Sequence, residues 1–547
     1  MTRLKASVFL LLLWAAIYLP GLGSTEIKGE EGRRILPAIT MLETGQWLVP
    51  SVGGKPFLRK PPLVNWAIAA SFEITGVRNE WTARLPSALC VLALGLTIVG
   101  TSGAGWLKVE TAFVAAILAM TQIGLLAKAR FAGAEIEGIY APLSGIAIVL
   151  WLAWWARGAS RWLLWTVPGV FLGLASLAKG PSLHLLFFYA VVIAILWRSA
   201  RRAAAPLAGF AREFFHPAHF AGVAIAAGIF AAWAVPYFQT PEAKDAAQVW
   251  KRQGIDRFTE AEVTAGGYAL NVPRALADQL PWLLLAPVLV RRLRREKTAP
   301  PLVENGRAVE WGSLVPVVAI LWLVILLIPG TLPRYVLPLG SVFALALAWA
   351  VEGEAAALRR WFTADRIFAG IVLLGALAAP VVAGYPLESG SRFDVATAVR
   401  AGFASTSALA VVALIFARRP HGFTAAWLAG ASAALLGAAM LLYAGAAVRW
   451  INRSDDLRPF AAQIDAAVPP GATLTLYDPG YQAWVFYLRS PYRYATSREE
   501  IPARPAAVLT RGGEKVRRKF AKDRADLAVA QTFRNKTGAE YLLFLPR

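Results

Sequence analysis

The sequence predicts an α-helical polytopic membrane protein that ends in a small α/β domain. Hydrophobic residues make up 57% of the 547 residues and charged residues only 16%, whereas a soluble domain carries about 25% charged residues. Apolar runs of the length that crosses a bilayer recur along residues 1–446, and a helix needs about 20 residues to do so. Residues 447–547 lose these runs and show short alternating segments instead.

Thirteen apolar runs are read as membrane spans. The first follows a basic N-terminal segment in the manner of a signal peptide, but we expect it to remain as an uncleaved span. The runs are 7–22, 83–103, 109–127, 134–156, 162–178, 181–198, 218–238, 276–291, 312–329, 334–351, 366–385, 402–418 and 425–446.

Basic residues predict which loops are cytoplasmic. Their clusters are at Arg157 and Arg161, Arg198 to Arg212, Arg291 to Lys297, Arg359 to Arg366, and Arg418 with Arg419. With thirteen spans and a cytoplasmic N-terminus, every cluster falls on the cytoplasmic side, as the positive-inside rule requires. The external side then receives the loops 23–82 and 239–275 and the tail 447–547. We therefore expect a transmembrane domain over 1–446 and a soluble external domain over 447–547.

The tail is expected to be a small α/β domain. Arg458–Ala467 has the pattern of a helix, and four segments have the pattern of strands. The strand segments are Thr473–Pro479, Trp484–Leu488, Ala506–Thr510 and Tyr541–Leu545.

Composition also excludes several classes of protein. The net charge is +22, but the basic residues lie between apolar runs rather than in one compact basic domain, which disfavours nucleic-acid binding. Cys90 is the only cysteine, so an intrachain disulfide is excluded. Four histidines leave little room for a His-rich metal site.

The first external loop carries two adjacent carboxylates. Glu30 and Glu31 come just before an amphipathic segment that begins near Arg33 and is expected to end at Gly45. The positive end of a helix dipole favours an ionised carboxylate at that place. These acids are candidates for a catalytic base, and the alternative is that they are solvated capping residues.

A basic pair follows on the same loop. Arg59 and Lys60 precede Pro61 and Pro62, which hold the backbone extended, and a second amphipathic stretch runs from Val64 to Thr75. A basic pair on a stiff turn at the membrane surface suits a lipid phosphate. The alternative is general attraction to anionic headgroups.

Further ionisable residues lie at span ends on the external side, where the positive-inside rule predicts few basic residues. The basic ones are Lys128, Arg130, Lys179, Arg252, Arg257 and Arg334, and the acids are Glu135, Glu137, Asp256, Glu260 and Glu262. Ionisable residues at membrane depth are candidates for function, although a span-end lysine also snorkels without any function. Together they suit a cavity in which cations hold a leaving phosphate and a carboxylate acts as general base. Because no glycine-rich nucleotide motif is present, the activated group is expected to arrive already linked to a lipid.

An ordered series of motifs resembles a known family. The series is the acidic pair after the first span, Arg33, Trp47-Leu48-Val49-Pro50, Lys60-Pro61, Arg130 with an acid five residues on, Lys179-Gly180, Arg257-Phe258, Pro281-Trp282 and Leu332-Pro333-Arg334-Tyr335. It resembles the aminoarabinose:lipid A transferases and the protein O-mannosyltransferases, which are GT-C glycosyltransferases that use polyprenyl-phosphate sugars. The landmarks extend over residues 26 to 338.

The resemblance implies roles for individual residues. It implies that Glu30 is the catalytic carboxylate, with Glu31 as the acid beside it, and that Lys60, Arg257 and Tyr335 bind the donor phosphate. Lys179 matches the Lys-Gly of the family, and we add Lys179, Arg59 and Arg334 to the phosphate-binding residues for their position. Arg130 and Glu135 are expected at the same site.

The sequence departs from the family at four positions. Glu30 stands where the family usually has Asp, and Glu135 likewise replaces an Asp. Arg59 stands where the aminoarabinose enzymes have Glu before Lys-Pro, and 259–275 contains no His. Those last two positions bind a metal in that branch, so no metal site is expected there. The resemblance therefore indicates the class of reaction rather than the aminoarabinose substrate.

These observations predict a multi-pass glycosyltransferase of a bacterial inner membrane, with its site and C-terminal domain facing the periplasm. A sugar would pass from a polyprenyl-phosphate carrier to an envelope acceptor such as lipid A, another glycolipid, a glycan or a protein, with inversion. The expected partners are the bilayer, the lipid-linked donor and the acceptor, without nucleic acid and without a certain cofactor. One alternative is a transporter or flippase of a lipid-linked anion, although the halves show no internal symmetry. Another is a non-catalytic lipid-binding subunit.

Overall fold

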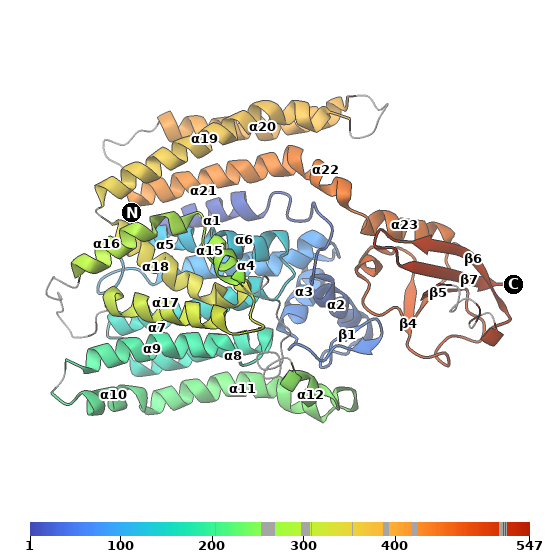
Figure 1. Cartoon of the computed structure of the whole chain (residues 1–547), viewed down its shortest axis with the longest axis horizontal. Coiled ribbons are helices and arrows are strands. Elements are labelled where there is room, and N and C mark those ends of the chain that lie inside the picture. The colour runs from blue at the N-terminus through green and yellow to red at the C-terminus, as the bar shows by residue number, and fades with distance from the viewer. Residues whose placement is uncertain are drawn as a thin grey trace.

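A computed structural model gives the fold of the chain. It describes all residues except 203, 253–268, 297–306, 308, 353, 387–392, 418–423, 514–517, 519 and 521. Helices that run along the long axis form a bundle, and a β-sheet domain lies at one end of that axis (Figure 1). The short helices α2 and α3 lie at the end of the bundle that faces the sheet domain. The predicted fold class is confirmed.

Nine helical stretches in the described part of the chain are long and apolar enough to cross a membrane. They are α4 (Glu80–Gly100), α7 (Glu137–Ala156), α8 (Arg161–Lys179), α9 (Leu183–Ala200), α11 (Pro217–Gln239), η5 with α18 (Pro333–Leu339 and Gly340–Val351), α19 (Ala355–Gly384), α20 (Val395–Ala417), and α21 (Ala425–Leu442) continued through η6 (Tyr443–Ala447) and α22 (Val448–Ile451).

A tenth stretch is bent by 56°. It consists of α5 (Val109–Met120), α6 (Ile123–Leu126) and the π-helical turn η1 (Ala127–Phe131). At the bend, Gln122 Nε2 donates to the Gly340 carbonyl at 2.9 Å, and Trp282 Nε1 donates to Thr121 Oγ1 at 2.9 Å. These two hydrogen bonds therefore tie the interrupted helix to α18 and to the segment around Trp282 at the bend.

Besides the bent stretch, three of the thirteen predicted spans are shorter than the nine long helices or are divided among several elements. The first forms α1 (Arg3–Tyr18) with 16 residues, and 312–329 forms α17 (Trp311–Leu327) with 17 residues. The run 276–291 is divided among α15 (Asn271–Ala277), η4 (Trp282–Leu285) and α16 (Ala286–Glu296). Pro281 lies at this division, and a proline has no N–H with which to continue a helix. Hydropathy located all of these apolar runs, but it does not report where a helix breaks.

Short elements complete the membrane-proximal part. They are α2 (Gly32–Thr44), the hairpin β1 (Ser51–Val52) and β2 (Lys55–Pro56), α3 (Leu63–Thr75), α10 (Pro206–Phe214), η2 (Pro241–Ala243) and α12 (Ala246–Lys251). The helix expected to end at Gly45 does so, with Gly45 in the left-handed conformation at φ 71° and its N–H bonded to the Met41 carbonyl. The amphipathic stretch Val64–Thr75 is α3.

The C-terminal domain is a five-stranded mixed sheet covered by α23 (Leu457–Ala467). Its strands lie in the order β4-β3-β5-β7-β6, with β3 parallel to β4 and β5, and β7 antiparallel to β5 and β6. The bounds are β3 (Leu474–Tyr477), β4 (Tyr492–Ala495), β5 (Ala507–Arg511), β6 (Leu527–Arg534) and β7 (Glu540–Pro546), with the short helix η7 (Asn452–Ser454) leading into the domain.

Three of the predicted strands and the predicted helix of this domain are confirmed, and one strand is wrong. Residues Ala483–Tyr487 form the 3₁₀-helix η8, in which Trp484 is buried against Phe460 and Tyr541. A short apolar run is compatible with either a strand or a helical turn. Here the packing of Trp484 accompanies the helical turn. The strands β4 and β6 lie outside the predicted segments.

The domain is joined to the first loop by a buried carboxylate. Glu26 accepts hydrogen bonds from the backbone N–H groups of Asp456, Leu457 and Arg458 at 3.2, 2.9 and 2.6 Å, and its side chain is 3% exposed. It thereby caps the N-terminus of α23 from a distant part of the chain. The Ile27 N–H also donates to Tyr487 Oη at 2.8 Å. The sheet domain is thus fixed within a few residues of Glu30.

Replacing Glu26 with alanine is expected to loosen this junction. The variant leaves three N–H donors at a helix start without their acceptor, which costs about 1–3 kcal/mol of stability. Thermal melting of the full chain in detergent should show the loss. Glu43→Ala is the matched control, because Glu43 makes an exposed ion pair with Arg78 at 2.9 Å and exposed pairs contribute little. Equal melting temperatures for the two variants would contradict the capping role.

Candidate active site

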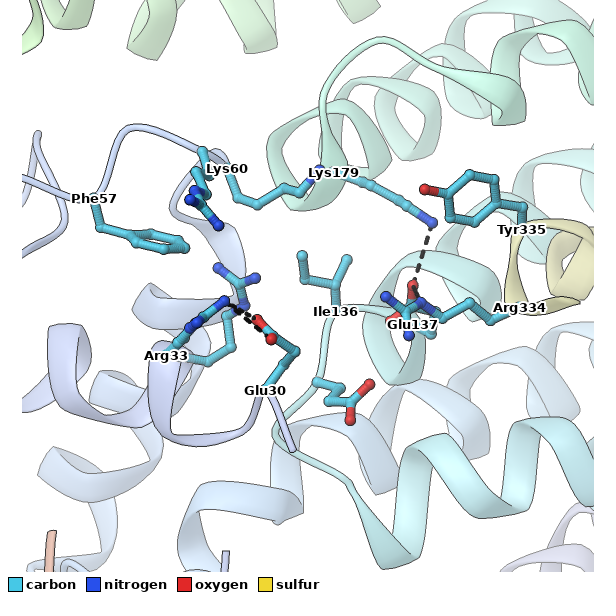
Figure 2. A pocket seen from close by; sticks show the side chains of 12 residues that line it. Glu30, Arg33, Phe57, Lys60, Ile136, Glu137, Lys179, Arg334 and Tyr335 are labelled. Carbon is cyan, nitrogen blue, oxygen red and sulfur yellow. Dashed lines mark hydrogen bonds and ion pairs between the residues drawn. The ribbon is translucent and has the colours of Figure 1, made fainter. Parts of the chain in front are cut away.

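Four segments that are distant in sequence enclose a polar pocket of about 250 Å³ at the end of the bundle near α2. They are the first loop, the start of α7, the C-terminal end of α8, and η5. Figure 2 shows Glu30, Arg33, Phe57 and Lys60 on one side, and Glu137, Arg334 and Tyr335 on the other, with Ile136 between them. The lining residues are Glu30, Arg33, Arg34, Phe57, Arg59, Lys60, Glu135, Ile136, Glu137, Lys179, Arg334 and Tyr335.

Glu30 lines the pocket from the turn before α2. Its carboxylate accepts from Arg33 Nη1 at 3.0 and 3.1 Å, and 43% of its side chain is exposed. The turn that carries Glu30 leads directly into α2. It is closed by a hydrogen bond from the Arg33 N–H to the Glu30 carbonyl at 3.1 Å. An exposed carboxylate at this place is accessible to a substrate hydroxyl.

Glu31 does not line the pocket, although the sequence predicts it as a candidate for a catalytic base. It is fully buried and forms a two-point ion pair with Arg84, with distances of 2.8 and 2.9 Å. Its oxygens also accept from the Lys28 N–H at 2.7 Å and the Ala134 N–H at 3.1 Å. Adjacent residues at a helix start point in different directions, which explains why one acid faces the pocket and the other the interior. The geometry makes Glu31 the residue that fixes the loop carrying Glu30.

Arg130 also lies outside the pocket, although it was expected at the site. Its side chain is buried, and it donates from Nε to the Ile17 carbonyl at 2.8 Å and from Nη2 to the Pro20 carbonyl. The guanidinium lies over the rings of Phe131 and Tyr443. It therefore closes the C-terminal end of α1, where helix carbonyls lack intrahelical partners.

Glu135 does line the pocket, as expected. Its Oε2 lies 2.8 Å from Lys128 Nζ. Lys128 belongs to η1 and Glu135 to the segment that links η1 to α7, so the ion pair ties this segment back onto η1.

A second charged group occupies the opposite side of the pocket. The buried carboxylate of Glu137 lies 3.3 Å from Lys179 Nζ and 3.0 Å from Arg334 Nε. The ammonium of Lys179 also lies over the rings of Tyr140 and Tyr335, at 4.7 and 4.5 Å from their centroids. Lys179 therefore points into a cavity rather than to the membrane surface. Two cations share one acid here, which leaves a net positive charge.

The remaining predicted donor residues divide between the pocket and the undescribed part of the chain. Arg59, Lys60 and Tyr335 line the pocket. Arg257 lies outside the described residues, as do Asp256, Glu260 and Glu262.

Four further charged or aromatic side chains line the pocket without a predicted role of their own. They are Arg33, Arg34, Phe57 and Glu137. Arg34 follows Glu30 by four positions, a spacing that places two residues on one face of a helix, and this signal was available in the sequence. The sequence predicts Glu137 only as an acid at the end of a span. Its contacts with Lys179 and Arg334 arise because α7, α8 and η5 meet at the pocket.

The pocket is strongly cationic. Six of its lining residues are basic and three are acidic, which suits an anionic ligand such as a phosphate. Within the described ranges, His, Cys, Asp and Glu side chains form no group of three or more that would hold a metal ion.

The sequence is similar to that of known glycosyltransferases. Residues 59–215 match the family model described as dolichyl-phosphate-mannose-protein mannosyltransferase. An undecaprenyl phosphate-α-4-amino-4-deoxy-L-arabinose arabinosyl transferase of Pseudomonas savastanoi is 25% identical over 371 residues, which cover 65% of this chain and 64% of the relative. The corresponding protein of Erwinia tasmaniensis is 25% identical over 330 residues, or 56% of this chain and 52% of that protein. The chain thus spans less than two thirds of these relatives.

The fold is that of a solved membrane protein. The crystal structure of ArnT from Cupriavidus metallidurans bound to undecaprenyl phosphate has a TM-score of 0.62 at 18% identity, with 99% of this chain and 97% of that chain covered. The apo structure of the same protein has a TM-score of 0.60.

Fold and sequence similarity together define the class: the chain resembles the GT-C membrane glycosyltransferases, as its motifs predicted. Within that class, it is similar to the aminoarabinose transferases and shares the fold of ArnT.

Proposed function

We propose that the chain is an integral-membrane glycosyltransferase that moves a sugar from a polyprenyl-phosphate donor to an envelope acceptor at the periplasmic face of a bacterial inner membrane. The observation that carries the proposal is the pocket in which the exposed carboxylate of Glu30 faces a group of cations. Residues 1–446 would form the catalytic membrane domain, and 447–547 a periplasmic domain beside the site. The donor is the only co-reactant that we assign.

The reaction is a single displacement. An acceptor hydroxyl or phosphate oxygen attacks the anomeric carbon of the sugar while the bond from that carbon to the lipid phosphate breaks. Glu30 takes the proton of an attacking hydroxyl, as a general base does. The polyprenyl monophosphate leaves with the bonding electron pair, and attack from the side opposite to it inverts the anomeric centre.

The cations stabilise the leaving phosphate. Lys60 and Arg59 approach from the first loop, and Lys179, Arg334 and Tyr335 approach from the opposite side. Fixed cations at the place where negative charge develops lower the barrier without reorganisation. A phosphate-binding role for Arg257 rests on the family resemblance alone, because this residue lies outside the described part of the chain.

An apolar cavity supplies a place for the prenyl chain. It has a volume of about 340 Å³ and is lined by α15, α17, α18 and the end of η5, including Leu339 and Gly340. These two residues follow Tyr335 closely in the chain. A prenyl unit attached to a phosphate at Tyr335 would therefore meet an apolar surface, which favours its burial.

The decisive experiment uses purified full-length protein in vesicles, with radiolabelled polyprenyl-phosphate sugars and an envelope extract that contains lipid A, glycans and proteins. Transfer of label to an acceptor, with inversion at the anomeric carbon, supports the proposal. Label that crosses the bilayer on its original carrier supports a flippase instead. Binding of the donor with neither outcome supports a non-catalytic subunit.

Replacing Lys60 with alanine is expected to weaken donor binding. The variant removes one charge-assisted hydrogen bond to the phosphate, so the dissociation constant for undecaprenyl phosphate should rise about 10- to 100-fold. Lys55→Ala is the matched control, because this lysine lies on the same loop in an exposed ion pair with Asp478 at 2.7 Å. Equal affinities of the two variants in a ligand-binding assay would exclude Lys60 from the phosphate site.

A further inference from the structure

Arg34 is a buried cation with donors that are not used. It lies on α2 and lines the pocket, and its residue is only 5% exposed. Its Nε and Nη1 atoms have no hydrogen-bond partner within the described parts of the chain. The guanidinium lies 5.2 Å from the centroid of the Phe57 ring, which holds it in place without using its N–H groups.

This arginine remains charged at neutral pH. Burial lowers the pKa of Arg34 to about 10, and the nearby carboxylates of Glu30 and Glu137 oppose that effect. A buried charge without hydrogen-bond partners is costly. An anion in the pocket beside Arg34 would supply these missing partners.

The acids of the pocket are already engaged by other cations. Arg33 binds Glu30, and Lys128 binds Glu135. Lys179 and Arg334 both bind Glu137. No carboxylate among the described residues forms an ion pair with Arg34, which leaves its Nε and Nη1 donors available to an anion in the pocket.

Position separates Arg34 from the cations that would hold the lipid phosphate on the opposite side of the pocket. Lys179, Arg334 and Tyr335 belong to α8 and η5, whereas Arg34 lies in the first turn of α2, four residues after Glu30 in the turn that precedes this helix. An anion bound by Arg34 would therefore lie on the side of the pocket that holds Glu30, Phe57 and Lys60 rather than beside Lys179 and Arg334.

We propose that Arg34 forms a second anion subsite, which binds a carboxylate or phosphate carried by the transferred sugar or by the acceptor. Arginine binds both of these groups through charge-assisted hydrogen bonds. The inference rests on the proposed glycosyltransferase function and narrows it to substrates that carry a negative charge besides the lipid phosphate.

The test compares ligands that differ only in this charge. Purified full-length protein in nanodiscs is titrated with undecaprenyl phosphate, with polyprenyl-phosphate hexose and with polyprenyl-phosphate hexuronate. A second arm uses a glycolipid acceptor with and without its phosphate. Wild type is compared with Arg34→Gln and Arg34→Lys. The matched control is Arg78→Gln, which removes an arginine from an exposed ion pair outside the pocket.

We expect wild type to prefer the charged member of one pair by about 10- to 100-fold. Arg34→Gln should abolish that preference, Arg34→Lys should restore part of it, and Arg78→Gln should retain it. Loss of preference for the hexuronate identifies the sugar as the source of the anion, and loss for the phosphorylated acceptor identifies the acceptor. The melting temperature without ligand should not fall in Arg34→Gln, because no native hydrogen bond of the side chain is lost.

Two results would overturn the inference. One is an unchanged preference in Arg34→Gln, and the other is an equal loss of affinity for every ligand, including undecaprenyl phosphate, which would place Arg34 among the lipid-phosphate cations. A wild-type protein that does not bind undecaprenyl phosphate at all would overturn the proposed function itself, and that failure is visible before any variant is tested.

Discussion

Glu30→Gln is expected to lower the turnover number for sugar transfer by about 10²- to 10⁴-fold, the contribution that a positioned general base makes. The amide has nearly the shape of the carboxylate but does not accept the proton of an acceptor hydroxyl. Because the exposed ion pair with Arg33 contributes little to stability, the variant should fold normally. Affinity for undecaprenyl phosphate should remain close to that of wild type.

The measurement is a steady-state transfer assay combined with a donor-binding titration. Glu43→Gln is the matched control, since Glu43 lies on the same helix in an exposed ion pair with Arg78, and its turnover should equal that of wild type. A Glu30→Gln enzyme with unchanged turnover would remove Glu30 from the reaction. A large loss of donor affinity with normal turnover would make Glu30 a binding residue instead.

The apolar runs of the sequence were enough to predict the membrane bundle. Hydrophobic length located the long helices because a bilayer requires every span to be apolar along its whole length. Hydrophobic length does not show where a helix is interrupted. Such interruptions lie at Pro281 and at the bend after α5, where Thr121 and Gln122 form hydrogen bonds with other elements. These contacts join segments that are more than 150 residues apart, and no periodicity reports them.

The candidate site was predictable to the extent that charge at membrane depth is unusual. Lys60, Lys179 and Arg334 were recognised because basic residues are unexpected on that side, and the structure brings them to one pocket. The direction in which a side chain points was not predictable. Glu30 and Glu31 are adjacent in sequence, but only Glu30 faces the pocket.

Replacing Glu31 with glutamine is expected to cause the largest loss of stability of any variant considered for this protein. Arg84 would keep its charge in a site where its side chain is 1% exposed, without the carboxylate that balances it. Breaking a buried ion pair in this way costs about 3–5 kcal/mol. The loss should appear as a lower free energy of unfolding in denaturant titrations of the full chain in micelles.

The consequence for activity separates a positioning role from a catalytic one. Arg84 also binds the carbonyls of Leu22 and Glu26, so the pair ties the loop that carries Glu30 to α4. At a temperature low enough to keep Glu31→Gln folded, its turnover should exceed that of Glu30→Gln, because the base is still present. The double variant Glu31→Gln with Arg84→Met should regain part of the stability, since no unpaired charge remains. Equal, near-zero turnover in the folded Glu30→Gln and Glu31→Gln proteins, with normal stability of the latter, would instead make Glu31 part of the chemistry.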